Sequence, residues 1–200
     1  ALIPNHFHLL LKTGAVPIAT VMRRLLSGYA QSFNRRHRRH GHLFQNRYKS
    51  ILCQEDTYLL ELVRYIHLNP LRASVVPDLR RLNMYPFCGH GVLLGKRKKK
   101  FQDIKTVLIQ FGPTMETARA KYRAYVKKKI CVGKRPELSG GGLVRSIGGW
   151  EAVKALRKSG LFQKADQRIL GDGDFVERVL AQSDERLESK FFLKAQGSRR

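Results

Sequence analysis

The 200-residue chain is strongly basic, with 39 Lys and Arg against 15 Asp and Glu and a formal net charge of +24 at pH 7. This charge favours a polyanionic partner, with nucleic acid as the first candidate. The hydrophobic content of 42% supplies a modest core and excludes disorder throughout the chain. Residues 1–139 hold 27 basic and 7 acidic side chains, whereas residues 140–200 hold 12 and 8. We therefore expect the polyanion to meet residues 1–139.

The cysteine content and the hydropathy indicate the cellular compartment in which the protein works. Cys53, Cys88 and Cys131 are odd in number and form no Cys-x-x-Cys pair, so neither a disulfide framework nor a zinc knuckle is predicted. No apolar run approaches the roughly 20 residues of a membrane helix, and no basic leader precedes a cleavable apolar segment. These features predict a cytoplasmic protein without a membrane partner.

The chain opens on two histidines in an apolar run. Residues 4–11 are typical of a strand. Successive side chains of a strand point to opposite faces, so His6 and His8 share one face and could hold a metal ion. The alternative is a strand with one solvated polar face, which an isolated His-x-His pattern does not exclude.

A helix and a second strand are predicted next. After the breakers Gly14 and Pro17, apolar residues recur at helical spacing from residue 18 to residue 33, and we expect their stripe to cover one face of a sheet. The stripe consists of Val21, Leu25, Leu26, Tyr29 and Phe33. The Arg- and His-rich residues 35–42 should be exposed. Residues 43–52 mix aromatic and basic side chains and predict a strand whose basic face either contacts phosphate or is simply solvated.

A second helix is expected over residues 58–68, with acidic residues at its start and an end before Pro70. Its buried stripe would be Leu59, Leu62, Val63 and Ile66. Tyr65 and Asn69, four residues apart, adjoin on the flank of that stripe. A tyrosine in this place is ordinarily a core-edge residue with its hydroxyl in water.

The rest of the chain is predicted to be helical, with a hinge at the glycines 140–142. Helices are expected over residues 101–111, 115–129, 150–158 and 175–187, the last capped by Asp172 or Asp174. The predicted domains are residues 1–76, a basic helical extension over 77–139, and a helical region over 140–200.

Three blocks of the sequence together resemble the landmarks of one family. They are residues 4–11, 41–49 and 65–73. In this order they are similar to the REP-associated tyrosine transposases, which belong to the IS200-like, single-tyrosine HUH transposase group. The resemblance covers residues 1–75 and is far more specific than the His-x-His pattern alone.

The resemblance implies an α+β fold and a DNA-nicking site. A partial ferredoxin-like sandwich, with helices on one face of an antiparallel sheet, would precede a mostly helical C-terminal extension. His6 and His8 would bind magnesium or manganese, Asn69 would complete the metal site, and Tyr65 would be the nucleophile. The substrate would be single-stranded or hairpin DNA, which Tyr65 would nick to leave a 5′-phosphotyrosine and a free 3′-hydroxyl. A phenol has a reference pKa of about 10, so this nucleophile needs a phosphate that the metal activates.

Charge alone suggests the residues that contact the DNA backbone. They are Arg35, Arg36, Arg38, Arg39, Arg47, Lys49 and Arg72. In the family a strand and a helix precede the His-x-His strand, and this chain is expected to lack them. Without them the sheet would expose an unpaired edge, so this chain is expected to fold poorly or to associate, for example as a homodimer.

Two other functions compete with the transposase. The first is a non-catalytic DNA- or RNA-binding remnant that keeps the basic surface. The second is a histidine-triad nucleotide hydrolase, which needs a further histidine at position 10, where Leu10 stands. Tyr48 and Tyr58 are the fallback nucleophiles.

Overall fold

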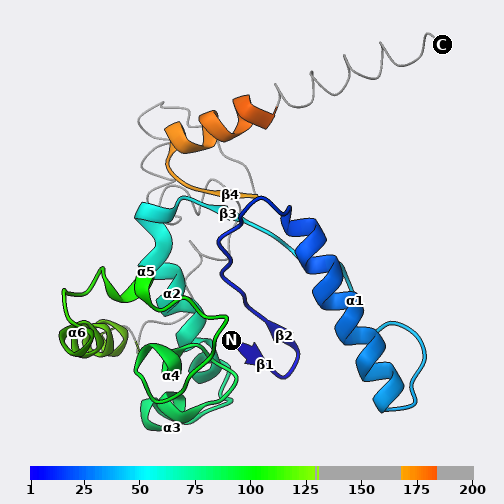
Figure 1. Ribbon diagram of the computed structural model, residues 1–200, viewed down its shortest axis with the longest axis horizontal. Helices are drawn as coiled ribbons and strands as arrows, with labels where there is room; N and C mark the ends of the chain where they lie inside the picture. Colours follow the sequence, from blue (N-terminus) through cyan, green and yellow to red (C-terminus); the bar gives the residue numbers. More distant parts are fainter. Residues whose placement is uncertain (129, 131–167, 184–200) are drawn as a thin grey trace, which may run out of the picture. The chain divides into compact units, whose positions relative to one another are not determined.

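The computed structural model describes residues 1–128, 130 and 168–183, in which helices dominate and strands are short (Figure 1). The strands are β1 (Leu2–Ile3), β2 (His6–Phe7), β3 (Leu52–Cys53) and β4 (Ile169–Leu170). The helices are α1 (Ile18–Arg36), α2 (Glu55–Arg72), α3 (Leu79–Met84), α4 (His90–Leu93), α5 (Lys105–Leu108) and α6 (Met115–Lys127), and residues 173–183 are also helical. The α+β class predicted from the sequence is confirmed. Within the described ranges, no helix combines the length and the apolar character that crossing a bilayer requires.

The strands form two small sheets. Of the strand expected over residues 4–11, only β2 is regular strand. Residues 4–5 form a turn that joins β2 to β1 in an antiparallel hairpin, in which Leu2 pairs with Phe7 and Ile3 with His6. The strand expected over residues 43–52 is wrong, because only β3 is extended there, and β3 pairs in parallel with β4. Residues 43–52 contain only one β-branched residue, Ile51, and the polar Gln45 and Asn46 interrupt the segment, so its preference for a strand over a loop is weak.

The chain divides into two compact units: Leu10–Ser50, and Ala1–Leu9 together with Ile51–Arg200 as far as the latter is described. The domain boundaries predicted from the sequence stay a prediction. The glycines 140–142 and the helix expected over 150–158 lie outside the described residues.

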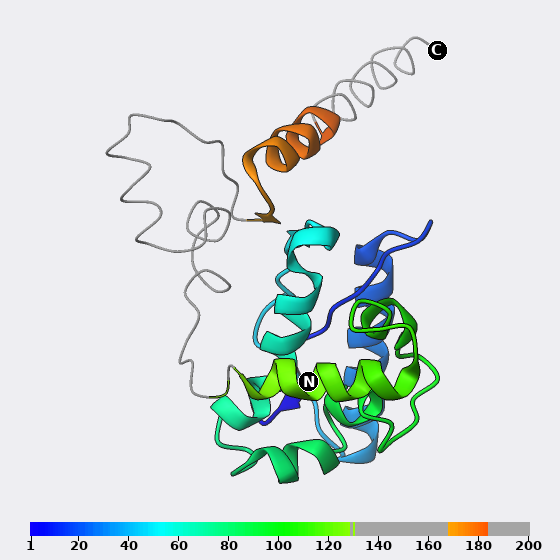
Figure 2. The same cartoon turned by 90° about the vertical axis from the view of Figure 1, so that its left-hand side faces the viewer.

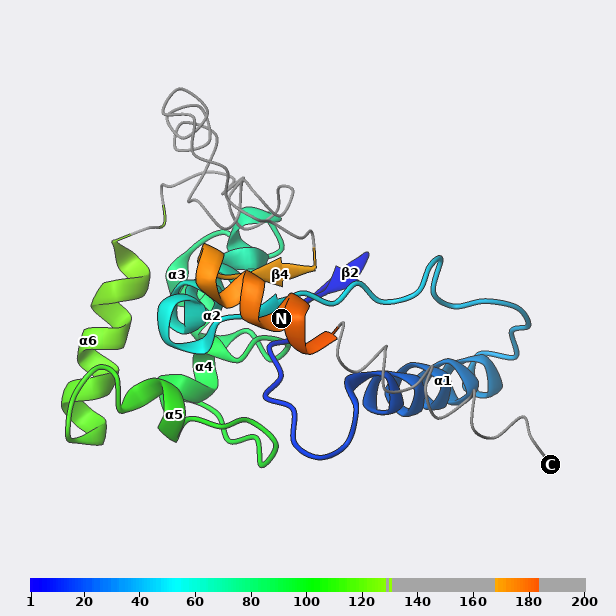
Figure 3. The same cartoon turned by 90° about the horizontal axis from the view of Figure 1, so that it is seen from above.

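The unit Leu10–Ser50 consists of α1 and the loop that runs back beside it, which Figure 3 shows. The loop is tied to the helix by Asn34 Nδ2, which donates to the Gly41 carbonyl oxygen at 2.9 Å. The predicted buried stripe is wrong in part, because Val21, Leu25 and Tyr29 are 39%, 48% and 56% exposed. The described chain contains no broad sheet that this face of the helix could cover.

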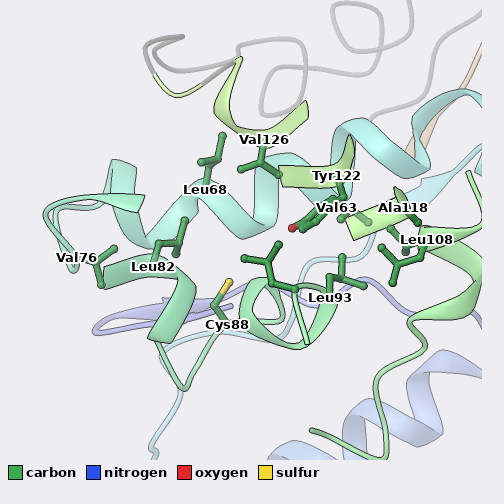
Figure 4. Close-up of a cluster of buried hydrophobic side chains, with 12 residues drawn as sticks. Val63, Leu68, Val76, Leu82, Cys88, Leu93, Leu108, Ala118, Tyr122 and Val126 are labelled. Carbon is green, nitrogen blue, oxygen red and sulfur yellow. The ribbon is translucent and has the colours of Figure 1, made fainter. Parts of the chain in front are cut away.

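The main core of the other unit lies between α2 and the helices that follow it. In Figure 4, Val63 and Leu68 of α2 point toward Tyr122 and Val126 of α6. Figure 2 shows the same packing as a crossing of α6, in yellow-green, over α2, in cyan. Leu68 and Tyr122 are each 0% exposed, so both helices are fixed by burial of large side chains.

Helix α2 is longer than expected. The predicted end before Pro70 is wrong, because the helix continues to Arg72 with the proline inside its last turn. The turn is held by the Ala73 amide, which donates to the Asn69 carbonyl at 2.9 Å, and the Pro70 side chain is fully buried. Burial in the core therefore offsets the hydrogen bond that proline cannot donate.

A buried polar network joins α2, α4 and α6. The Tyr122 hydroxyl lies 2.8 Å from His67 Nδ1 and 2.7 Å from His90 Nδ1, and His90 Nε2 lies 3.0 Å from Asn83 Oδ1. An amide oxygen only accepts, so His90 Nε2 carries the proton and His90 Nδ1 accepts from Tyr122. The Tyr122 oxygen then accepts from His67 Nδ1–H. One hydroxyl thus satisfies two buried imidazoles.

Burial sets the protonation of this network. It lowers the pKa of His67 well below 6.5, and together with the charge of Arg123 it lowers the pKa of His90 to about 4. It also raises the pKa of Tyr122 above its usual value. All three side chains are therefore neutral near pH 7.

Capping side chains and one glycine explain where several helices begin or end. Thr114 caps α6 by accepting from the Thr117 amide. Asp172, one of the two caps predicted for the last described helix, accepts from the Phe175 amide at 2.8 Å. Gly95 follows α4 with a φ of +75°, and a Cβ there would lie 2.8 Å from the guanidinium carbon of Arg119. The turn after α4 therefore requires glycine.

Candidate functional site

The β1–β2 hairpin brings His6 and His8 side by side. His6 lies in β2, and the His8 amide extends the hairpin by donating to the Ala1 carbonyl at 2.9 Å. The two ring centroids are 5.0 Å apart with an interplanar angle of 84°. The alternation expected from a strand thus places both imidazoles at one location, although the regular strand is only two residues long.

Each histidine has a ring nitrogen that could bind a metal ion. His6 Nδ1 lies 2.8 Å from Asn5 Oδ1, and because that oxygen only accepts, His6 Nδ1 donates to it and leaves Nε2 as the nitrogen that could bind a metal ion. His8 Nε2 is buried and has no hydrogen-bond partner among the described residues. Burial, followed by the neighbouring His6, lowers the pKa of His8, so its imidazole is neutral near pH 7.

Tyr65 projects from α2 toward this pair. Its ring centroid lies 5.8 Å from that of His8, with an interplanar angle of 77°. Arg72, seven residues later and therefore on the same side of the helix, places its guanidinium carbon 5.5 Å from the centroid of the Tyr65 ring. A phenol, a cation and two imidazoles therefore meet at one place.

His6 and His8 fit a divalent metal ion, and they would fill only part of its coordination shell. An unpartnered buried imidazole nitrogen on His8 and an oriented imidazole on His6 are two ligands of the kind that metal sites use. In the part of the chain that the structure describes, no group of three or more His, Cys, Asp or Glu gathers around one point. An ion bound here would therefore keep open positions for oxygen ligands. Asn69 lies one helical turn after Tyr65 and is 9% exposed, and its role as a third ligand stays a prediction.

The basic residues expected to contact DNA fall in two places. Arg72 lies beside Tyr65. The others belong to the unit Leu10–Ser50 and are exposed, with Arg39 placed 5.8 Å over the ring of Phe33. They are Arg35, Arg36, Arg38, Arg39, Arg47 and Lys49.

The first third of the chain is similar to a known protein family. Residues 1–69 match the family described as "Transposase IS200 like". The transposase match contains His6, His8, Tyr65 and Asn69, and it ends inside α2. It supports a DNA-processing enzyme with DNA as its partner. No curated protein and no solved structure matches the chain significantly.

Sequence reasoning missed two features of these surfaces. Asn5 is the partner of His6, and only its place in a tight turn next to the histidine could have indicated this. Tyr29 and Phe33 were expected in a core, yet with His37 they form a row of rings along α1. Their spacing of four residues was the available signal, and it is shared by buried and exposed stripes alike.

Proposed function

We propose that this chain is a single-stranded DNA transposase or nuclease of the REP-associated tyrosine group, which nicks and rejoins hairpin-associated DNA through a 5′-phosphotyrosine on Tyr65. The observation that carries the proposal is the ring of Tyr65 at 5.8 Å from that of His8, inside the segment that matches IS200-like transposases. The charge of +24 supports a nucleic-acid substrate.

The nicking step uses groups that lie together. The Tyr65 oxygen bonds to the phosphorus, the bond from phosphorus to the 3′ oxygen breaks, the phenol proton passes to solvent, and the 3′ oxygen takes up a proton. The Arg72 guanidinium, 5.5 Å from the Tyr65 ring, offsets the negative charge of the attacking oxygen and of the phosphate. A magnesium or manganese ion on His6 and His8, when bound, would polarise a nonbridging phosphate oxygen. Attack by the free 3′-hydroxyl reverses the step and rejoins the strand.

Covalent adduct formation tests the proposal. The substrate is a pool of single-stranded oligonucleotides with a hairpin next to a randomised segment, in the presence of Mn²⁺. Because the phosphotyrosine forms on the 5′ end of the downstream fragment, a 3′ label should move with the denatured protein, and a 5′ label should report a shortened strand. The Tyr65→Phe variant should form no adduct, and chelation of the metal should suppress the adduct in the wild type.

Tyr58→Phe is the matched control, since it removes a hydroxyl from a half-buried tyrosine of the same helix. It should keep the adduct. An adduct that persists in Tyr65→Phe would reject Tyr65 as the nucleophile. A wild type that binds the pool and forms no adduct would leave the non-catalytic nucleic-acid-binding remnant, which the net charge of +24 alone supports.

A further inference from the structure

The unit Leu10–Ser50 is a purely cationic part of the chain. It contains nine Lys and Arg residues and no Asp or Glu. No acidic residue occurs before Glu55, so no carboxylate within this unit can neutralise its charge. Such a field attracts any polyanion and does not by itself distinguish one nucleic acid from another.

Aromatic rings are interleaved with this charge. Along α1, Tyr29 and Phe33 have ring centroids 6.0 Å apart, and Phe33 and His37 have centroids 4.2 Å apart. Phe44, from the returning loop, places its ring 6.3 Å from Tyr29. Tyr29 is 56% exposed although it contacts both phenylalanines. The row therefore holds the loop against α1 and still offers ring surface to a ligand.

A groove lies beside the row, between the second half of α1 and residues 41–47. The groove is open to solvent and has a volume of about 650 Å³, and its lining combines apolar side chains with hydrogen-bonding groups. Those groups include the side-chain amides of Gln31, Asn34 and Asn46. Amides that both donate and accept suit the polar edges of a nucleobase, and the apolar walls suit its faces.

We propose that this groove and its row of rings bind unpaired bases of single-stranded DNA, while the arginines around them hold the backbone phosphates. Stacking requires an exposed base face, which a duplex covers, so the combination of rings and cations favours a single strand. The choice of DNA rests on the proposed function, whereas the choice of an unpaired strand rests on the groove itself. The site is made of side chains other than those of the nicking site, so the two proposals can fail separately.

Fluorescence anisotropy on the full chain carrying Tyr65→Phe tests the inference without cleavage. The probes are a labelled oligothymidine and an abasic oligonucleotide of the same length and charge. The parent chain should bind the oligothymidine more tightly than the abasic strand. Adding Tyr29→Ala should weaken oligothymidine binding by about 5- to 150-fold, as expected for the loss of one stacked base, and should leave abasic binding unchanged. Tyr29→Phe should restore the preference.

Two further variants separate stacking from charge. Phe101→Ala is the matched control, because Phe101 is 85% exposed with the Lys99 ammonium 5.6 Å over its ring, outside the groove. It should change neither affinity. Arg47→Gln should weaken both probes equally and lower the slope of log affinity against log salt by about 0.7.

The inference is overturned by any of four results. They are equal binding of the abasic and oligothymidine strands by the parent chain, tighter binding of a duplex, tighter binding of an RNA strand of the same sequence, and a loss in Phe101→Ala as large as that in Tyr29→Ala. Circular dichroism of each variant verifies its helix content. An adduct assay that fails while the base preference stands would reject only the proposed nicking function.

Discussion

Removal of the buried Tyr122 hydroxyl should destabilise the protein more than the small size of this group suggests. In Tyr122→Phe the aromatic ring stays, and two buried imidazole nitrogens, on His67 and His90, lose the group that lies 2.8 and 2.7 Å from them. A buried polar group without a partner costs about 1–3 kcal/mol, so the free energy of unfolding should fall by roughly 2–6 kcal/mol. With an m-value of about 2 kcal/mol per molar urea, the midpoint should fall by roughly 1–3 M.

Urea denaturation followed by far-ultraviolet circular dichroism measures this loss. Tyr85→Phe is the control, since the Tyr85 hydroxyl donates to the Leu2 carbonyl at 3.0 Å in an exposed place where water can replace it. We expect this control to lose less than about 1 kcal/mol. A loss in Tyr122→Phe no larger than that of the control, at an unchanged m-value, would refute the role assigned to the Tyr122 hydroxyl.

Three further predictions follow from the described contacts. His90 has a pKa of about 4 in the folded chain against a usual 6.5, so the unfolded chain binds more protons between these two values. The contribution of His90 to stability should therefore be full above pH 6.5 and fall by roughly 3 kcal/mol on acidification to pH 4, in addition to the loss from His67, whose pKa is lowered in the same direction. A free energy of unfolding that depends on pH as steeply in His90→Gln as in the wild type would contradict this. Arg72→Gln should slow adduct formation by Tyr65 by roughly 2- to 30-fold, and equal rates would exclude the contribution of this cation. Gly95→Ala should lower the free energy of unfolding by roughly 1–3 kcal/mol in the same urea assay, because its φ of +75° strains any side chain, and a neutral result would show that the turn relaxes.

Local sequence patterns predicted the helices with the strongest periodicity. The start of α1 at Ile18 and that of α6 at Met115 agree with the expected residues 18 and 115. The helix expected over residues 101–111 shortens to α5, which covers only Lys105–Leu108. Short elements depend on packing, and periodicity over so few residues does not reveal which neighbours they will have.

The site could be predicted only as far as its residues lie close in sequence or match the family. His6 and His8 are one residue apart, and their proximity follows from strand geometry. The approach of Tyr65 to His8 depends on how α2 packs against the hairpin, and no local pattern encodes it. The Tyr122 network was missed for the same reason, since His67 and Tyr122 are separated by 55 positions.

Helix α2 contributes side chains both to the candidate site and to the core. Tyr65 lies on the side of the histidine pair, and His67 and Leu68 lie on the side packed against α4 and α6. A fragment cut at residue 69, where the transposase match ends, would stop inside this helix and expose Leu68, which is 0% exposed in the chain. We therefore expect that the segment matching the family model does not fold by itself, and that a fragment made to test the proposed nicking has to extend through α6.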